Sequence, residues 1–486
     1  MKKGFDNEKY LKIQSEEIKK RIALFDSKLY LEFGGKLFDD FHASRVLPGF
    51  DPNSKIKILQ ELKDDAEIIF CINASDIEKK KVRADYGITY DMELIRLINI
   101  LRDLNIYVSS VVITLYKGQD GIDKFRSKIE DMNIKTYIHY PTLGYPADIE
   151  TIVSEKGYGK NEFIKTTRKL VVVTAPGPSS GKLATCLSQL YHEHKNNVKA
   201  GYAKYETFPV WNLALKHPVN MAYEAATADL HDINMIDSFH LEAYNEKAVN
   251  YNRDLQTFPI LKNILEKIMK NDVYKSPTDM GVNMVGHCIS DENIVKDASK
   301  KEIIRRYFNS LVDVKMGKYD CGVPKSIKVL MNELKINAND RKVYNACLEK
   351  QKKENKDVIA LELPNGKVIT GKETDILSCA STLFINAIKE LTNIPDDVYL
   401  LSPSVLEPIL DLKKQLGNNT ILQLDEVLIA LSICKVTNPI IVTALDNMRK
   451  LENCDAHASY ILSNEELKIL KNLKINITCE AMFKKI

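Results

Sequence analysis

The chain has 486 residues, which is more than one hydrophobic core usually organises, so two or three domains are expected. A hydrophobic fraction of 44%, a charged fraction of 28% and a formal net charge of +3 exclude a fibrous or disordered protein and argue against nucleic acid as the main partner. No apolar stretch is long enough to cross a bilayer, and the polar start MKKGFDNEKY lacks the apolar core of a secretion signal, so a cytoplasmic protein without a membrane partner is expected.

The first residues predict a helix, a strand and a loop that is a candidate for substrate binding. The helix is expected to begin at Asp6 or Asn7, and a strand at residues 28–33 ends in a Gly-Gly-Lys turn. Long loops after the carboxyl end of a strand are often functional in open α/β sheets. The side chains expected to contact a substrate here are Lys36, Asp40, His42 and Arg45. A packed surface loop with solvated charges is the competing interpretation.

From residue 51 to residue 205, short apolar runs alternate with amphipathic stretches. Strands are expected at residues 66–73, 106–116, 135–139, 170–174 and 198–205, and helices lie between them. This alternation predicts right-handed βαβ crossovers. The fold class is therefore α/β, with a doubly wound, mostly parallel sheet of the Rossmann-like or P-loop-like type. Ligands of such sheets bind beyond the carboxyl ends of the strands, so the loops that follow the strands are expected to share one rim.

The loop at residues 175–181, APGPSSG, is the strongest candidate for a ligand site. It follows an apolar strand and precedes a helix, so its backbone N–H groups and the positive end of the helix dipole suit a phosphate or a carboxylate. The residues expected to hold a nucleotide or another phosphorylated molecule are Gly177, Ser179, Ser180, Gly181, Lys182 and Thr185. An ordinary strand-to-helix turn that binds nothing is the competing interpretation.

Two departures separate this loop from the P-loop pattern G-x-x-x-x-G-K-[ST]. Pro176 stands in place of the first glycine, and Leu183 stands in place of the hydroxyl residue that binds Mg²⁺. After the helix, the segment GYAK resembles the strand of P-loop enzymes of the dethiobiotin-synthetase type, which carry a lysine there. This resemblance implies that Lys204 is a second phosphate-neutralising cation and that Glu206 is a metal or substrate ligand.

Residues 208–254 are dense in imidazoles and carboxylates. Asp229 and Asp232 are expected to face the central rim, where either would organise a metal or deprotonate an acceptor. Together with Lys182 and Lys204 they form the expected catalytic set. The three histidines of the segment offer an alternative metal site, but none of them shows a metalloenzyme spacing such as HExxH.

The remaining chain predicts a second, smaller domain. Its hairpin at residues 358–370 is expected to turn at Asn365-Gly366 in a type I′ turn. Further short strands are expected at residues 398–401, 458–462 and 475–479. The expected domains are an α/β anion- or nucleotide-binding domain at residues 1–272, a helical connecting segment at residues 273–335 and a mixed α/β domain at residues 336–486.

Several long strings follow one another along nearly the whole chain: GGKLFDDFHASRVLPGFDP, APGPSSGKLATCLSQLYHEH, AGYAKYETFPVWNL, HPVNMAYEAATADLHDINMID and LPNGKVITGK. In these strings the chain is similar to a bacterial family known as domain of unknown function 1846 and uncharacterised protein family 0371. The resemblance implies a cytosolic protein with an N-terminal α/β domain and a smaller C-terminal domain, and it implies no particular reaction. Members typically carry PGPGSGK in the loop, so Ser179 replaces a glycine here.

These features lead to one principal hypothesis and two alternatives. The principal hypothesis is an enzyme that binds a nucleotide or another phosphorylated metabolite and performs kinase-like or ligase-like chemistry, with ATP and Mg²⁺ as the expected cofactors. The first alternative is a nucleotide-independent enzyme that acts on an anionic metabolite through histidine and aspartate. The second alternative is a ligand-sensing protein whose pocket regulates assembly. A homo-oligomer is expected because most soluble oligomers are built from one chain and the C-terminal third is helical.

Overall fold

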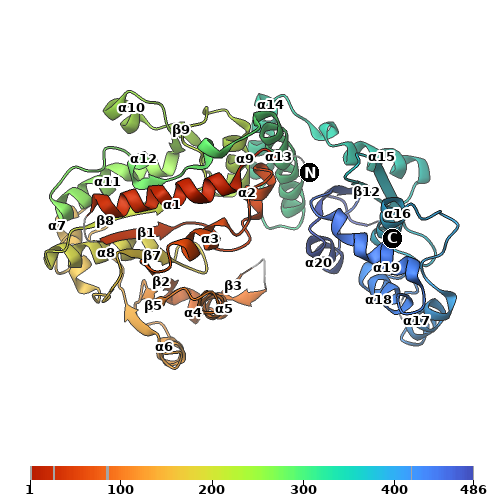
Figure 1. Cartoon of the computed structure of the whole chain (residues 1–486), viewed down its shortest axis with the longest axis horizontal. Coiled ribbons are helices and arrows are strands. Elements are labelled where there is room, and N and C mark those ends of the chain that lie inside the picture. Colours follow the sequence, from red (N-terminus) through yellow and green to blue (C-terminus); the bar gives the residue numbers. More distant parts are fainter. Residues whose placement is uncertain (1–2, 26–27, 84–86, 418, 485–486) are drawn as a thin grey trace. The chain divides into compact units, whose positions relative to one another are not determined.

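The computed structural model describes residues 3–25, 28–83, 87–417 and 419–484 (Figure 1). The chain divides into two compact units, residues 2–299 and residues 300–486, and the boundary between them falls within helix α13 (Glu292–Lys315). The predicted α/β class is confirmed, because the first unit contains a seven-stranded parallel sheet and the second contains a smaller mixed sheet. No helix in the described ranges is long and apolar enough to cross a membrane.

The first unit is built on a sheet with the strand order β11-β8-β1-β7-β2-β5-β6, in which all neighbouring strands run parallel. β1 therefore lies between β7 and β8, and the carboxyl ends of all seven strands meet at one edge. All five residues of β7 are buried, as expected for a central strand covered on both faces. The strands are β1 (Lys28–Phe33), β2 (Ala66–Asn73), β5 (Val108–Thr114), β6 (Lys135–Ile138), β7 (Leu170–Thr174), β8 (Ala200–Tyr205) and β11 (Gly281–Val282).

Helices cover both faces of this sheet. The α-helices of the first unit that precede α13 are α1 (Asn7–Leu24), α2 (Phe41–Val46), α3 (Ser54–Glu61), α4 (Ala74–Glu78), α5 (Tyr90–Asp103), α6 (Ile122–Glu130), α7 (Ile149–Ile152), α8 (Lys182–Lys195), α9 (Pro218–Ala226), α10 (Ser238–Tyr244), α11 (Asn252–Met269) and α12 (Pro277–Met280). Tyr30 of β1 donates a hydrogen bond to Glu193 of α8, whereas the hydroxyl group of Tyr205 lies 2.7 Å from that of Tyr10 on α1. Because alternate strand residues face opposite sides, α1 and α3 cover one face and α8 and α11 cover the other (Figure 1).

Shorter elements complete the first unit. The small strands form two antiparallel pairs, β3 with β4 and β9 with β10. Their bounds, with those of the short 3-10 helices, are β3 (Val82–Arg83), β4 (Ile88–Thr89), β9 (Asn234–Ile236), β10 (Val249–Tyr251), η1 (Tyr158–Lys160), η2 (Ala228–Leu230) and η3 (Val285–Cys288).

The second unit contains a four-stranded mixed sheet of order β13-β12-β14-β15. Strand β12 pairs antiparallel with β13 and β14, and β14 pairs parallel with β15. Helix α16 packs on β12 and β13, and its apolar face forms one core with α18 and α19. The elements are β12 (Val358–Glu362), β13 (Val368–Lys372), β14 (Asp455–Ala458), β15 (Asn476–Cys479), α14 (Gly322–Glu333), α15 (Lys342–Glu354), α16 (Cys379–Thr392), α17 (Pro403–Gln415), α18 (Leu424–Cys434), α19 (Pro439–Asp446), α20 (Asn464–Asn472), η4 (Ala338–Asp340) and η5 (Asn447–Leu451).

The hairpin between β12 and β13 forms as predicted, but the type I′ turn is wrong. That turn needs a positive φ at both central residues, and of the pair Asn365-Gly366 only Gly366 has one, at 83°. Pro364 precedes this pair, and its ring fixes φ at the value that a type I turn needs at its second position. The N–H of Gly366 donates to the carbonyl of Leu363 at 2.8 Å, which closes a turn of that kind.

Two predicted strands of the second unit are also wrong. Residues 398–401 adopt bends rather than a strand, and the apolar side chains of Leu400 and Leu401 reach the core from this irregular segment. The strand expected at residues 458–462 lies earlier, at Asp455–Ala458, because those are the residues that pair with β12 and β15. Apolar content alone therefore did not distinguish residues that pair in a strand from loop residues whose side chains are buried in the core.

Candidate anion-binding site

The sheet order brings three predicted segments to one edge. Glu32 of β1 pairs with Val173 of β7, and Phe33 pairs with Tyr205 of β8. The segments that follow these strands therefore begin side by side at the carboxyl edge, and we call this region the β1–β7–β8 rim. It contains the turn after β1, the loop at residues 175–181 and the end of β8.

The loop after β7 lies directly on neighbouring elements. Gly181 has a φ of 78° and is the N-cap of α8, and no side chain caps this helix. A Cβ atom on Gly181 would lie 2.9 Å from the Cβ of Thr114, and one on Gly177 would lie 2.4 Å from the ring of Tyr90. Side chains at these two positions would push the loop away from β5 and α5, so both glycines are required for its path.

Side chains from the sheet edge hold the carbonyl groups of this loop. The bonds are Arg83 Nη1 to Pro176 O at 3.5 Å, Asn73 Nδ2 to Ser179 O at 3.3 Å and Thr114 Oγ1 to Ser180 O at 2.7 Å. In a trans peptide the N–H points opposite to the carbonyl of the same plane. The N–H groups of Gly177, Ser180 and Gly181 therefore point away from the side chains that hold the loop.

These N–H groups are available to a ligand. In the described part of the chain they have no acceptor, and neither have the first-turn N–H groups of Lys182 and Leu183. The hydroxyl of Ser180 is also without a partner among the described residues, although the residue is only 3% exposed. Donor groups gathered at the positive end of a helix dipole form a site for an oxyanion.

A buried ammonium group shapes the turn after β1. Lys55 of α3 is 6% exposed, and its Nζ donates to the carbonyls of Gly34 at 3.0 Å and Lys36 at 3.1 Å. By the same peptide geometry, the N–H groups that follow these carbonyls point away from Lys55. Burial lowers the pKa of Lys55, nearby Asp40 at 3.7 Å opposes that shift, and the charge of Lys182 adds to the lowering. Because β1 pairs with β7, this turn begins beside the loop that follows β7.

Lys204 at the end of β8 belongs to a compact ion cluster. Its Nζ lies 2.7 Å from Glu206 Oε1 and 2.9 Å from Asp254 Oδ2. Burial alone would lower the pKa of Lys204, but the carboxylates of Asp254 and Glu206 raise it well above its ordinary value. Burial raises the pKa of Glu206, and Lys204 opposes that shift. Two carboxylates face one ammonium group, so the lysine leaves carboxylate oxygens able to accept hydrogen bonds from a hydroxyl or amino group.

The two aspartates predicted to be catalytic lie near this cluster. Asp232 is 4% exposed and forms an ion pair of 3.2 Å with Arg253. Burial raises the pKa of Asp232, Arg253 lowers it, and the charges of Asp254, Lys204 and Asp229 also act on it. Asp229 is exposed in η2. The rim therefore presents N–H groups without acceptors in the described part of the chain, and two carboxyl groups whose pKa values are raised by burial, Glu206 and Asp232, lie in or near the ion cluster of Lys204.

The other predicted site residues take different positions. Asp40 caps α2 by accepting a hydrogen bond from the N–H of Ala43, and Arg45 lies in the last turn of that helix. His42 of α2 packs its ring edge-on against Phe208 at 5.2 Å. Thr185, which was predicted to hold a nucleotide, is fully buried and accepts a hydrogen bond from the thiol of Cys71 at 3.4 Å. Its side chain therefore faces the core rather than the loop.

Comparison with known proteins identifies the family. Residues 3–335 match the model described as domain of unknown function DUF1846, N-terminal, and residues 339–486 match the model of its C-terminal domain. The chain belongs to the DUF1846 family. It is 55% identical over 491 aligned residues to a UPF0371 protein of Clostridium tetani (strain Massachusetts / E88), and the match covers 99% of this chain and 98% of the relative.

Two further relatives of this DUF1846 protein are similar at nearly the same level. It is 52% identical to a UPF0371 protein of Clostridioides difficile (strain 630) and 52% identical to one of Streptococcus thermophilus (strain ATCC BAA-250 / LMG 18311). Each match covers 99% of this chain and 98% of the relative. The family resemblance of the sequence is confirmed, whereas the likeness to dethiobiotin synthetases stays a prediction.

The described residues of this DUF1846 protein provide no preformed metal site. No group of three or more His, Cys, Asp or Glu side chains among them is arranged to hold an ion. In the histidine-rich segment, His217 bonds to Glu292 at 2.9 Å and His240 bonds to Ser276 at 3.0 Å, so these two rings serve separate contacts. At the loop, the position of the Mg²⁺-binding hydroxyl is Leu183. The donor set therefore fits a phosphoryl group, and it does not reproduce the metal ligand of a P-loop.

Sequence reasoning missed the residues that hold the loops in place. Asn73 and Thr114 are the last residues of β2 and β5, so the rule that ligands bind at the carboxyl edge gave a signal for them. Lys55 gave no such signal, because its partners are backbone carbonyls of a turn about twenty residues earlier in the chain. Asp254 lies far in sequence from Lys204, and only the fold brings them together.

Proposed function

We propose that this DUF1846 protein binds the phosphoryl group of a nucleotide or another phosphorylated small molecule at residues 177–182. One observation carries the proposal: the carbonyls of the loop are held by side chains on one side, so N–H groups without acceptors among the described residues point to the other. The dipole of the fourteen-residue helix α8 adds positive potential at the same place. Lys182, the first residue of that helix, would neutralise a phosphoryl oxygen.

The ion cluster at the end of β8 supports chemistry on the same ligand. Glu206 and Asp254 would accept hydrogen bonds from hydroxyl or amino groups of the substrate, while Lys204 keeps both carboxylates in place. Asp232, whose pKa is raised by burial, would take a proton from an acceptor group. Phosphoryl transfer or a ligase-type reaction uses both features, because each needs an anion cradle and a base on one rim.

A phosphorylated metabolite that binds without a metal is the second candidate. Two observations favour it over a Mg-nucleotide: Leu183 occupies the position of the metal-binding hydroxyl, and the hydroxyl of Thr185 is buried against Cys71. Nucleotide and metabolite share the phosphoryl group, so the same loop would serve both. The two candidates differ in their dependence on added Mg²⁺.

Isothermal titration of the full-length protein with inorganic phosphate, ADP and ATP, each with and without Mg²⁺, tests the proposal. Lys182→Ala is expected to weaken binding by about ten- to a hundredfold, since a hydrogen bond to a charged group contributes roughly 1.5–3 kcal/mol. Affinity for ATP that rises with Mg²⁺ would select the nucleotide, and affinity for phosphate that ignores Mg²⁺ would select the metabolite.

A matched control is available on α6. Lys124 lies in the first turn of that helix, which also begins after a left-handed glycine, Gly121, without a side-chain cap. Lys124→Ala should leave all the affinities unchanged. Binding of neither phosphate nor nucleotide at millimolar concentration, by a protein with native circular dichroism, would reject the proposed function.

A further inference from the structure

The second unit contains a polar pocket where the end of β12, the start of β14 and the start of α15 meet, and we call it the α15 pocket. Its volume is about 200 Å³, which is several times the roughly 30 Å³ that one water molecule occupies. It is smaller than the roughly 300–1,000 Å³ of pockets that hold drug-sized ligands. Apart from Val343, its lining consists of three basic and three acidic residues. The size and the lining suit a small, charged metabolite.

Backbone donors at the start of α15 face no acceptor in the part of the chain that the structure describes. The helix has thirteen residues and begins at Lys342, and its N-cap, Arg341, makes no side-chain cap bond. The N–H groups of Lys342 and Val343, both residues of the pocket wall, are without an acceptor among the described residues. The positive end of the helix dipole adds to their attraction for an oxyanion.

The side chain of Arg341 is a second, independent feature of the pocket wall. Arg341 is 2% exposed, its Nη2 lies 3.2 Å from Asp455 Oδ1 and donates to the carbonyl of Asn476 at 3.0 Å, and its Nη1 donates to Thr478. Its Nε has no partner within the described ranges. Burial lowers the pKa of Arg341, Asp455 opposes that shift, and the charge of Arg305 adds to the lowering. The buried guanidinium is thus only partly compensated, so an oxyanion in the pocket would stabilise it.

The acidic residues of the wall indicate that the ligand also carries a positive group. Asp455 pairs with Lys301 at 3.2 Å, and Glu362 pairs with Lys342 at 2.8 Å. Asp340 belongs to the capping box of η4 and forms no ion pair with another described residue. Three basic and three acidic residues leave the wall without a net formal charge. A ligand that carries both signs of charge therefore complements the wall better than a plain anion does.

We propose that the α15 pocket binds a small zwitterion of the amino-acid type. Its oxyanion group accepts hydrogen bonds from the N–H groups of Lys342 and Val343, next to the guanidinium of Arg341. Its ammonium group lies near the carboxylate of Asp340. The residues of this pocket all belong to the second unit, so the inference does not depend on the function proposed for residues 177–182.

Isothermal titration of the full-length protein with the common amino acids, one at a time, tests the proposal. Phosphoethanolamine is added as a zwitterion with a phosphoryl group, and acetate and inorganic phosphate serve as plain anions. At least one zwitterion is expected to bind with a Kd below about 1 mM. Binding of an amino acid would identify the oxyanion group as a carboxylate, and binding of phosphoethanolamine would identify it as a phosphoryl group.

A proline at the start of α15 shows whether the ligand occupies this pocket. Lys342→Pro removes a backbone donor at the first helical position, where proline is accepted, and the extended backbone of Arg341 (φ −91°, ψ 109°) suits a residue before proline. Lys342→Ala removes only the ammonium group. The proline variant should bind the zwitterion about tenfold more weakly than the alanine variant. Lys350→Ala is the matched control, because Lys350 lies on the same helix and pairs with Glu354 at 3.0 Å. It should leave the affinity unchanged.

Asp340→Asn tests the position of the ammonium group. Asparagine keeps an oxygen that can accept the capping hydrogen bond but removes the charge, so the preference for a zwitterion over acetate should fall by about tenfold. Three results would overturn the proposal: no binding of any zwitterion at about 10 mM, equal affinity of the Lys342→Pro and Lys342→Ala variants, or acetate that binds as tightly as the amino acids. Native circular dichroism of each variant separates loss of binding from loss of fold.

Discussion

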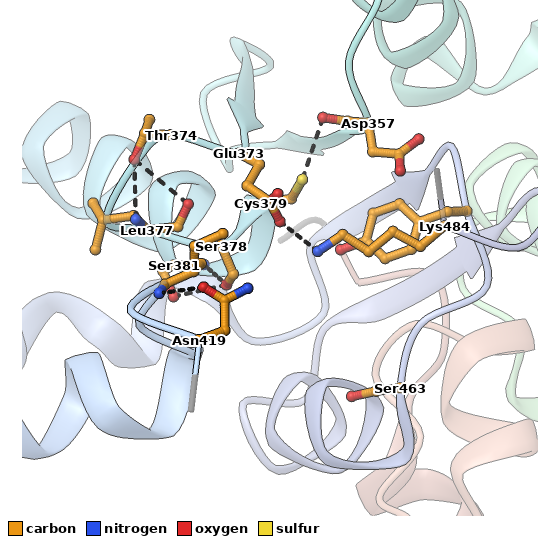
Figure 2. Close-up of polar contacts among 12 residues, drawn as sticks. Asp357, Glu373, Thr374, Leu377, Ser378, Cys379, Ser381, Asn419, Ser463 and Lys484 are labelled. Carbon is orange, nitrogen blue, oxygen red and sulfur yellow. Dashed lines mark hydrogen bonds and ion pairs between the residues drawn. The ribbon is translucent and has the colours of Figure 1, made fainter. Parts of the chain in front are cut away.

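Two helices of fourteen residues, α8 in the first unit and α16 in the second, begin in opposite ways. Helix α8 follows Gly181 and has no side-chain cap. Helix α16 follows Ser378, whose hydroxyl accepts a hydrogen bond from the N–H of Ser381 at 3.3 Å. Ser381 in turn donates to the carbonyl of Leu422 at 2.9 Å, and Ser378 and Ser381 are fully buried. Figure 2 shows this closed arrangement, in which the two serine hydroxyls lie side by side.

The difference shows that a helix dipole alone does not make an anion site. Both helices have the same length and therefore a similar dipole, but the start of α16 is occupied by its own serines and by the core. At α8 the cap position is a glycine, and neighbouring side chains bind the carbonyls of the loop instead of its N–H groups. The N–H groups before α8 are available because the neighbouring side chains bind the carbonyl side of each peptide and leave the N–H side without a partner.

The largest expected loss of phosphate affinity comes from adding a side chain at Gly181, the N-cap of α8. In Gly181→Ala the new Cβ would enter the space of Thr114, so the loop would move and phosphate affinity should fall by about a hundredfold or more. We also expect about 1–3 kcal/mol of lost stability from strain and overpacking. Calorimetric titration and urea unfolding measure both effects.

Gly121→Ala is the control for backbone strain. Gly121 is the N-cap of α6 with a φ of 76°, and a Cβ there meets nothing within 4 Å. This variant should lose about 1 kcal/mol of stability and no phosphate affinity. Equal loss of affinity in both variants would mean that the path of the loop over Thr114 is irrelevant to binding.

A smaller effect is expected from the turn after β1. Lys55→Met keeps the apolar stem but removes the ammonium that holds the carbonyls of Gly34 and Lys36, so phosphate affinity should fall by about tenfold. Lys57→Met on the same helix, where the side chain is 49% exposed, should leave the affinity unchanged. If both variants bind phosphate like the wild type, the turn contributes nothing to the rim.

Lys55 also gives a pH dependence with a defined sign. Because burial lowers its pKa in the folded protein, the unfolded chain binds more protons just below the ordinary pKa of lysine. Stability should therefore gain a contribution that increases as the pH rises through the lowered pKa toward the ordinary one. Lys55→Met should lack this contribution in urea unfolding curves recorded at increasing pH, whereas Lys57→Met should keep it.

The sequence predicted the fold more completely than the site. Apolar runs identified β2 and β7 with their observed bounds, because a strand buried on both faces is mostly apolar. Local pattern also placed the glycine-rich loop correctly between a strand and a helix, β7 and α8. The partners of Lys204 could not be found that way, because Asp254 reaches it from α11 across fifty residues of chain. Nor does local pattern tell that Thr185 turns into the core, since that depends on packing against Cys71.

Removing the side-chain cap of α16 should lower the stability of the protein moderately. Ser378→Ala removes the side chain that accepts the N–H of Ser381, and loss of such a cap costs about 1 kcal/mol. Ser402→Ala is the matched control, because Ser402 is the N-cap of α17 but makes no side-chain cap bond. Urea unfolding should show a clear loss in the first variant and little in the second. A larger loss for Ser402→Ala would contradict the role given to the Ser378 cap.

The smallest expected change concerns Cys379, the first residue of α16. A helix start normally favours a thiolate, but here burial raises the pKa of the thiol to about 12, and its Sγ donates to the carbonyl of Asp357 at 3.2 Å (Figure 2). At pH 8.5 only roughly one such thiol in three thousand would be ionised. Iodoacetamide should therefore modify the exposed Cys321 within minutes and leave Cys379 intact until urea unfolds the protein, as peptide mass spectrometry would record. Equal labelling of the two cysteines in the folded protein would show that reagents also reach the start of α16. The difference between the two helices would then consist only in the side chains that bind the carbonyls of the loop before α8.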